Sequence, residues 1–247
     1  MPMTSGCISL YNFRSEFRDL NNLRTRLNNY HSSRVENRRR LTSALRLNKS
    51  IGRLGNGVEI LSGIIYDEYL KTTGRVVREE DSDDEDSDPE FCVITEPYVD
   101  VRIGNFWILN NGLLISNKLA NRHFISDLIG KALDVEIKPC EINIRRVAED
   151  YPENWVGGII DREGNWQSGT LYGRDLRNDN LIGSEFITCT KNQVGGFTEY
   201  FGAGPTKFKV SRDSSVLVYL SWRTTRDPFI GFINQEISPY LVRPEFN

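Results

Sequence analysis

An acid, a second acid and a lysine alternate along the chain at Asp134, Glu136 and Lys138. Successive side chains of a β-strand point to opposite faces, so these three would share one face. Carboxylates that hold a divalent cation beside a lysine that orients water are the arrangement of a metal-dependent nuclease. The same alternation is also typical of the solvent-exposed face of a half-buried strand. A nuclease is therefore our third functional hypothesis.

A histidine with a nearby acid is a second candidate for chemistry. His123 has Asp127 four residues later, the spacing that brings two side chains together on a helix. A Ser-His-Asp triad also needs an activated serine. The G-x-S-x-G pattern is missing, because Trp166 stands where the first glycine before Ser168 belongs. We expect His123 to be an ordinary helix residue, and we name no catalytic residue.

Neither the cysteines nor the glycines predict a cofactor site. The four cysteines are far apart in the chain, at Cys7, Cys92, Cys140 and Cys189. Structural zinc sites usually draw on closely spaced pairs of ligands, and no C-x-x-C is present. The glycines at 52–57 and 202–204 lack the order and the following helix that a phosphate-binding loop needs, so we expect turns. The sequence predicts no metal and no cofactor.

An arginine-rich stretch is the strongest candidate for binding. Between Arg14 and Arg53 there are eleven lysines and arginines against three acids. The planar guanidinium group binds phosphate through two hydrogen bonds, which favours nucleic acid as the ligand. Ion pairing inside a protein assembly is the alternative, and we place it slightly ahead. The expected contact residues are Arg34, Arg38, Arg39, Arg40 and Arg46.

Charge is distributed unevenly along the chain. Residues 1–78 contain 14 lysines and arginines against six acids, a net charge of +8. Residues 79–90 contain nine acids and no base, and the rest of the chain holds 17 basic residues against 19 acids. The net charge of −3 hides this segregation and by itself indicates no special partner.

The basic segment has the apolar spacing of helices. Six positions recur at intervals of three and four residues, namely Phe13, Phe17, Leu20, Leu23, Leu27 and Tyr30. A second stretch repeats the pattern at Val58, Leu61, Ile65 and Tyr69. We therefore expect residues 1–78 to form a basic amphipathic helical arm.

The acidic run at 79–90 marks the best domain boundary. Nine like charges in twelve residues repel one another and cannot bury apolar area, so we expect a solvated linker. Ser82 and Ser87 are each followed three residues later by an acid, which is compatible with phosphorylation by an acid-directed kinase.

Residues 91–247 have the pattern of an antiparallel β domain. Residues 100–107 and 113–116 flank an Asn-Asn-Gly turn and predict a hairpin, followed by a helix over about 118–133. The further expected strands are 135–144, 155–160, 168–172, 186–190, 206–210 and 216–222. The expected fold class is α+β, with an N-terminal helical arm and an antiparallel sheet or sandwich covered by one helix.

The N-terminus and the apolar segments bear on the compartment. Residues 1–13 lack a basic stretch followed by an apolar one, so we expect no signal peptide. The longest apolar passage, 103–115, is broken by asparagines and is shorter than the roughly 20 residues of a membrane span. We expect a cytoplasmic or nuclear protein with no membrane partner.

Several short segments resemble the cypovirus polyhedrins, which crystallise inside infected insect cells. They are Trp107, Asn111-Gly112, Leu113-Leu114-Ile115, Asn117-Lys118, Ile125-Ser126, Lys131-Ala132-Leu133 and Ile237-Ser238-Pro239-Tyr240-Leu241. Together they cover about thirty residues in the order strand, turn, strand, helix, and the chain length is similar to that of the family. The resemblance implies a β-sandwich with an N-terminal helix that links trimers, no catalytic residues, and crystals that dissolve in alkali.

The leading functional hypothesis is a non-enzymatic, self-assembling structural protein, and its specific form is a viral occlusion-body matrix protein. A chain with separate basic and acidic segments can pair the basic segment of one copy with the acidic segment of another, which propagates when it does not close. A homo-oligomer or larger assembly is thus the expected partner. The second hypothesis is a nucleic-acid-binding protein that uses the arginine-rich segment.

Overall fold

The computed structural model describes residues 4–11, 19–78, 91–117, 122–202, 204–220 and 222–246. The acidic run at 79–90, with Ser82 and Ser87, lies outside these residues, so its predicted role as a linker stays a prediction.

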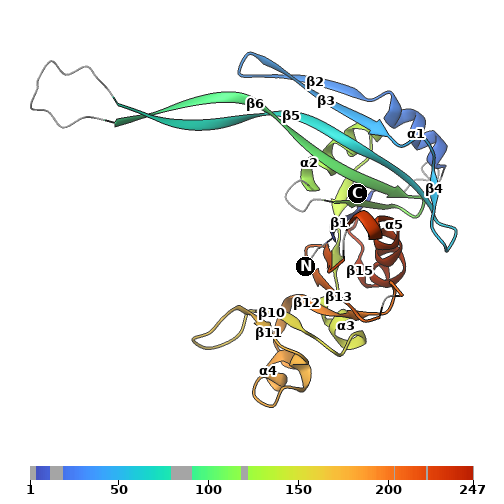
Figure 1. Ribbon diagram of the computed structural model, residues 1–247, viewed down its shortest axis with the longest axis vertical. Helices are drawn as coiled ribbons and strands as arrows, with labels where there is room; N and C mark the ends of the chain where they lie inside the picture. Colours follow the sequence, from blue (N-terminus) through green and yellow to red (C-terminus); the bar gives the residue numbers. More distant parts are fainter. Residues whose placement is uncertain are drawn as a thin grey trace, which may run out of the picture.

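One large antiparallel sheet organises the molecule (Figure 1). From one edge to the other its strands are β11 (Gly169–Tyr172), β10 (Val156–Ile160), β12 (Thr190–Thr198), β13 (Thr206–Ser211), β14 (Ser215–Val218), β1 (Thr4–Tyr11), β7 (Leu113–Ser116), β6 (Phe91–Leu109), β5 (Glu59–Arg78), β3 (Arg39–Leu47) and β2 (His31–Glu36). β4 (Gly52–Arg53) pairs with β5, and β8 (Ile137–Pro139) pairs with β1. β9 (Glu141–Ile142) and β15 (Leu241–Val242) pair with each other.

The helices are short and lie beside the sheet. They are α1 (Leu20–Asn28), α2 (Arg122–Leu133), α3 (Ile144–Asp150), α4 (Gly183–Thr188) and α5 (Trp222–Phe232), with the shorter turns η3 (Leu176–Asn178), η4 (Ile233–Ile237) and η5 (Ser238–Tyr240). Among the described helices, none combines the length and the apolar character that crossing a lipid bilayer requires.

Two hydrophobic cores lie on opposite faces of the central strands. Phe106 and Ile108 of β6 belong to the core that α1 and α2 cover, whereas Trp107 and Leu109 belong to the core that includes α5. Strands buried on both faces carry continuous apolar runs. This explains why 106–109 and 113–115 show no alternation of apolar and polar residues.

The predicted helical arm is wrong, and with it the α+β class that included this arm. Of residues 1–78, the described helix is α1 alone, where Leu20, Leu23 and Leu27 are buried as the helical spacing predicted. Residues 31–47 form the β2–β3 hairpin, and 59–78 form β5.

The second apolar stretch misled the prediction for a geometric reason. Leu61, Ile65 and Tyr69 are four residues apart, which is close to one turn of a helix but is also an even number. Even spacing places the three side chains on one face of a strand, and β5 has this arrangement. The isoleucines and threonines of the segment favour the strand.

The N-terminal and C-terminal segments share the sheet. β1 lies between β7 and β14, and β5 pairs with β6 over nineteen residue pairs, from Ile60–Leu109 to Arg78–Phe91. The acidic run therefore joins the ends of two paired strands.

Several expectations for residues 91–247 are confirmed, and two are wrong. The hairpin of 100–107 with 113–116 is present as β6 and β7, and the expected helix is present as α2. The expected strand at 186–190 falls mostly in α4. The expectation of one covering helix is also wrong, because α3, α4 and α5 are present in this segment beside α2.

Candidate functional site

The five arginines expected to make contacts all lie on the β2–β3 hairpin, not on a helix. Asn37 and Arg38 form its two-residue turn with φ values of 46° and 62°. Two successive left-handed residues are the geometry of the tight turn that suits the twist of paired strands. Arg38, Arg39 and Arg40 are thereby presented at an exposed hairpin tip.

Arg34 differs from the other four because it is bound to a buried acid. Its Nη1 lies 2.9 Å from Oδ1 of Asp67, and Arg102 lies 2.7 Å from Oδ2 of the same side chain. The Ser43 hydroxyl donates to Asp67 Oδ1 at 2.5 Å. Arg34 also donates to the carbonyl oxygen of Glu68. Four adjacent strands thus contribute to one charged network.

The network keeps Asp67 ionised although its side chain is only 2% exposed. Burial by itself would raise the pKa of this carboxyl group. Hydrogen bonds from Ser43, Arg34 and Arg102, together with the charge of Arg102, outweigh burial and hold the pKa below its ordinary value. The Arg102 guanidinium also lies over the ring of Phe124 at 4.5 Å. Arg34 is therefore a structural residue.

Beyond this network β5 and β6 continue as a two-stranded ribbon. We call residues 68–78 and 91–101 the ribbon; they pair with each other from Glu68–Val101 to Arg78–Phe91. β3 pairs with β5 only as far as Asp67, and β7 pairs with β6 only from Phe106 onward. Within the described chain both edges of the ribbon are unpaired, and Figure 1 shows it extending away from the body.

One face of the ribbon, and of the strand pair at its base, carries exposed apolar side chains around one acid, Glu68, which lies opposite Val101. Val99, Val101 and Ile103 of β6 are 39%, 49% and 44% exposed. Two half-buried residues of β5, Tyr66 and Leu70, lie on the same face opposite Ile103 and Val99. We call these five residues the outer stripe. The opposite face is polar, and there the Tyr69 hydroxyl donates to Asp100.

The residues of the nuclease hypothesis do not form a metal site. Glu136 and Lys138 form an ion pair of 3.0 Å, and Asp134 occupies a left-handed turn position after α2, with a φ of 55°. Across the described residues, no group of three or more histidine, cysteine or acidic side chains is arranged to hold a metal ion. The side chain of His123 lies outside the described residues.

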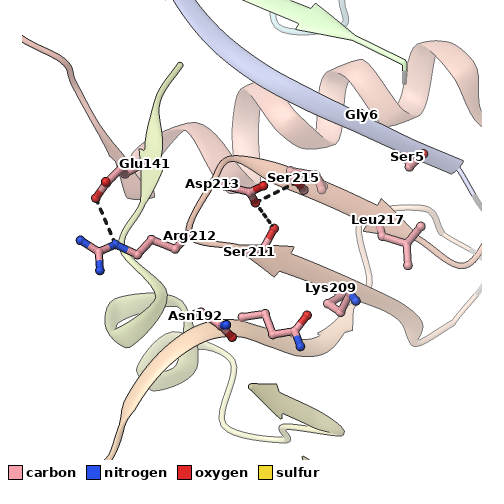
Figure 2. A pocket seen from close by; sticks show the side chains of 12 residues that line it. Ser5, Gly6, Glu141, Asn192, Lys209, Ser211, Arg212, Asp213, Ser215 and Leu217 are labelled. Carbon is pink, nitrogen blue, oxygen red and sulfur yellow. Dashed lines mark hydrogen bonds and ion pairs between the residues drawn. The ribbon is translucent and has the colours of Figure 1, made fainter. Parts of the chain in front are cut away.

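A cleft of about 700 Å³ lies where β1, β12, β13 and β14 meet (Figure 2). Figure 2 shows Ser211 and Ser215 around Asp213, at 2.5 and 2.9 Å from its Oδ1, and the Arg212–Glu141 ion pair at the side. One carboxylate oxygen accepts both hydroxyl groups within the β13–β14 turn. No histidine lines the cleft, so neither serine has a general base of the usual kind. This arrangement stabilises a turn.

Comparison with known proteins returned no relative: no family model, curated protein or solved structure matches the chain.

The outer stripe is the feature that the sequence analysis missed. Its signal was present in the alternation of apolar and charged residues from Val99 to Ile103. Alternation predicts a strand with one apolar face, but apolar faces are normally buried. Only the pairing of the strands shows that nothing in the described chain covers this face.

Proposed function

We propose that this protein is a self-assembling structural protein in which the ribbon joins one copy to the next. The observation that carries the proposal is the ribbon itself, with two unpaired edges and an exposed apolar stripe. An isolated two-stranded hairpin is marginally stable in water, and unpaired strand edges are templates for pairing with another chain. A second copy stacked on the outer stripe would bury its apolar side chains and so stabilise the ribbon.

The charge distribution supports contact between copies. Arg78, which the acidic run follows, lies eleven residues beyond Asp67 on β5, and Arg39 lies four residues before Ser43, the β3 partner of Asp67. At about 3.3 Å per residue, the arginine turn and the start of the acidic run differ by roughly 20 Å along the ribbon. Charges farther apart than about 8–10 Å are largely screened at physiological salt. The start of the acidic run is thus farther than this from the arginine turn of the same copy, and we propose that the two segments pair between copies.

An antiparallel pair of ribbons would satisfy both features at once. By strand alternation Arg40 and Arg46 lie on the same face of the sheet as the outer stripe. Two ribbons stacked through their stripes in opposite directions bring the acidic end of each toward the arginines of the other. The resemblance to cypovirus polyhedrins supports the same class of function, and an occlusion-body matrix protein in the cytoplasm or nucleus is its specific form.

Nucleic-acid binding is the second candidate, because Arg38, Arg39 and Arg46 make no ion pair with any described residue. Arg38 and Arg39 lie at the exposed hairpin tip and Arg46 is exposed farther along β3, positions suited to phosphate contacts.

The test is the sedimentation of full-length protein, nuclease-treated, with a charge placed on the outer stripe. Val101→Lys should abolish assemblies that wild type forms at micromolar concentration. Val242→Lys is the matched control, because Val242 is 50% exposed but lies on β15. Assemblies that persist in Val101→Lys, or a wild type that sediments as a monomer, would contradict the proposal.

A second arm of the experiment separates the two candidate functions. The double variant Arg39→Ala/Arg40→Ala should weaken assembly and make it less sensitive to salt. If the wild type is instead a monomer that purifies with nucleic acid, and the double variant does not, the nucleic-acid function replaces the structural one.

A further inference from the structure

A small pocket at the end of the molecule far from the ribbon collects three cations around one buried amide. Arg145 comes from α3, Arg177 from η3 and Lys191 from β12, and Asn154 precedes β10. The pocket has a volume of about 80 Å³, the room of roughly two to three water molecules at about 30 Å³ each. One tetrahedral oxyanion occupies a similar space.

Two of the three cations in this pocket have no acidic partner among the described residues. Glu149 is the acid that lines the pocket, and it pairs with Arg145 at 3.1 Å. Lys191 and Arg177 form no ion pair with any described residue. Lys191 Nζ donates to the carbonyl oxygen of Cys189 at 3.0 Å, which satisfies a donor but not the charge.

The ammonium group of Lys191 is positioned by a buried aromatic ring. The ammonium group lies 4.7 Å from the centre of the Phe186 ring, and Phe186 is buried against Gly157. Burial lowers the pKa of Lys191, and the nearby Arg145 and Arg177 lower it further. Lys191 is half-buried close to Arg177 and Arg145, so its charge is unfavourable there unless an anion joins it.

The buried amide of Asn154 sets a second requirement for any molecule that occupies the pocket. Asn154 is fully buried, and its Nδ2 donates to the carbonyl oxygen of Tyr151 at 2.6 Å. Its Oδ1 also lies buried and accepts no hydrogen bond from any described group. An unpaired buried acceptor is unfavourable, so an occupant must also bring a hydrogen-bond donor.

We propose that this pocket binds a phosphate group that keeps a hydroxyl donor for Asn154 Oδ1, while Lys191, Arg177 and Arg145 hold its charged oxygens. At neutral pH inorganic phosphate carries both negative oxygens and a P–OH group. Sulfate carries the charge but has no donor. The pocket should therefore distinguish two ions of nearly equal size and shape.

The test is calorimetric titration of the full-length protein with inorganic phosphate and with sulfate at constant ionic strength. Phosphate should bind at least about tenfold more tightly than sulfate, because a site built to accept a hydroxyl rejects an analogue without one. Arg177→Ala and Lys191→Met should each weaken phosphate binding by about tenfold or more. Arg174→Ala is the control, an exposed arginine three residues from Arg177 that does not line the pocket, and should bind as wild type does.

Two outcomes would overturn the proposal. One is the absence of saturable phosphate binding at tens of millimolar. The other is equal affinity for sulfate and phosphate that Arg177→Ala leaves unchanged, which would mean nonspecific screening. Glycerol 3-phosphate is a further probe: at neutral pH a phosphate monoester is mostly a dianion without a P–OH group, so it should bind more weakly than inorganic phosphate, and tighter binding would contradict the role given to Asn154. The outcome is independent of assembly, because none of these residues lies on the ribbon.

Discussion

Two clusters of cations, one at the base of the ribbon and one in the small pocket, are built in opposite ways. Arg34 and Arg102 surround the buried carboxylate of Asp67, which accepts from both of them and from Ser43. Lys191 and Arg177 line a pocket with the neutral amide of Asn154, whose oxygen accepts no hydrogen bond from the described residues. The first cluster satisfies its own charge and stabilises the fold. The second leaves charge and an acceptor unsatisfied, which is the property of a binding site.

The largest expected loss of stability follows replacement of Asp67, the buried carboxylate at the centre of the first cluster. Asp67→Asn removes the charge that two guanidinium groups face and should lower the free energy of unfolding by about 3 kcal/mol. This is the low end for a buried pair, because both arginines retain contact with water. Urea denaturation measures the loss.

The control for this variant is Glu36→Gln, because Glu36 pairs with the same Arg34 at 3.8 Å but is exposed. It should cost less than about 1 kcal/mol. Equal losses in the two variants would show that burial of Asp67 does not matter.

The packing that supports the second cluster can be broken without touching a charge. A Cβ atom at Gly157 would lie 2.2 Å from Cε2 of Phe186, so Gly157→Ala must displace the ring beneath Lys191. We expect a loss of about 2 kcal/mol, as for other overpacked cores, and weaker phosphate binding. Gly55→Ala meets nothing within 4 Å and serves as the control in thermal denaturation. A stable Gly157→Ala with unchanged binding would contradict the role given to Phe186.

The pH dependence of stability at acid pH is a second test of the first cluster, because it protonates Asp67 without replacing it. Because the pKa of Asp67 is lowered in the folded state, its contribution is fully present above the ordinary value of 3.8 and is lost as the pH falls through the folded value. The stability difference between wild type and Asp67→Asn should therefore shrink as the pH falls below 4. Urea midpoints measured from pH 7 to pH 3 check this, and a constant difference would refute it.

The smallest effect is expected for Lys191→Met. No acid loses a partner in this variant and a partly buried charge is removed, so stability should stay within about 1 kcal/mol of wild type or rise. The lowered pKa of Lys191 means that its burial cost is present while it is charged and disappears as the pH rises toward 10. Wild type and variant should converge there in thermal denaturation. A loss as large as that of Asp67→Asn would remove the distinction between the two clusters.

Local sequence patterns correctly predicted those elements whose apolar spacing fits a helix but not a strand, or a strand but not a helix. The buried residues of α2 include the neighbouring pairs Phe124–Ile125 and Leu128–Ile129, a spacing that suits one face of a helix but not one face of a strand. The Asn-Asn-Gly turn between two apolar runs fits a hairpin, and β6 and β7 form it. Both signals act within a few residues, so sequence alone suffices for them.

The candidate sites depended on contacts between distant segments. The sequence placed Arg34 with Arg38, Arg39, Arg40 and Arg46 in one basic group. The structure separates Arg34 from the others. Asp67 follows Ser43 by 24 residues in the chain, and the pairing of β3 with β5 brings the two side chains together beside Arg34. Likewise, Lys191, Arg177 and Arg145 have no common motif in the sequence.

The sequence by itself determined the segregation of charge, the apolar run of the central strands, the β6–β7 hairpin and helix α2. Tertiary structure alone decided that 31–47 and 59–78 are strands, because positions four residues apart align on a helix and on a strand alike, and only the neighbouring strands choose between them. It also decided which charges are paired. Ion pairs and burial join residues far apart in the chain, and no local spacing records them.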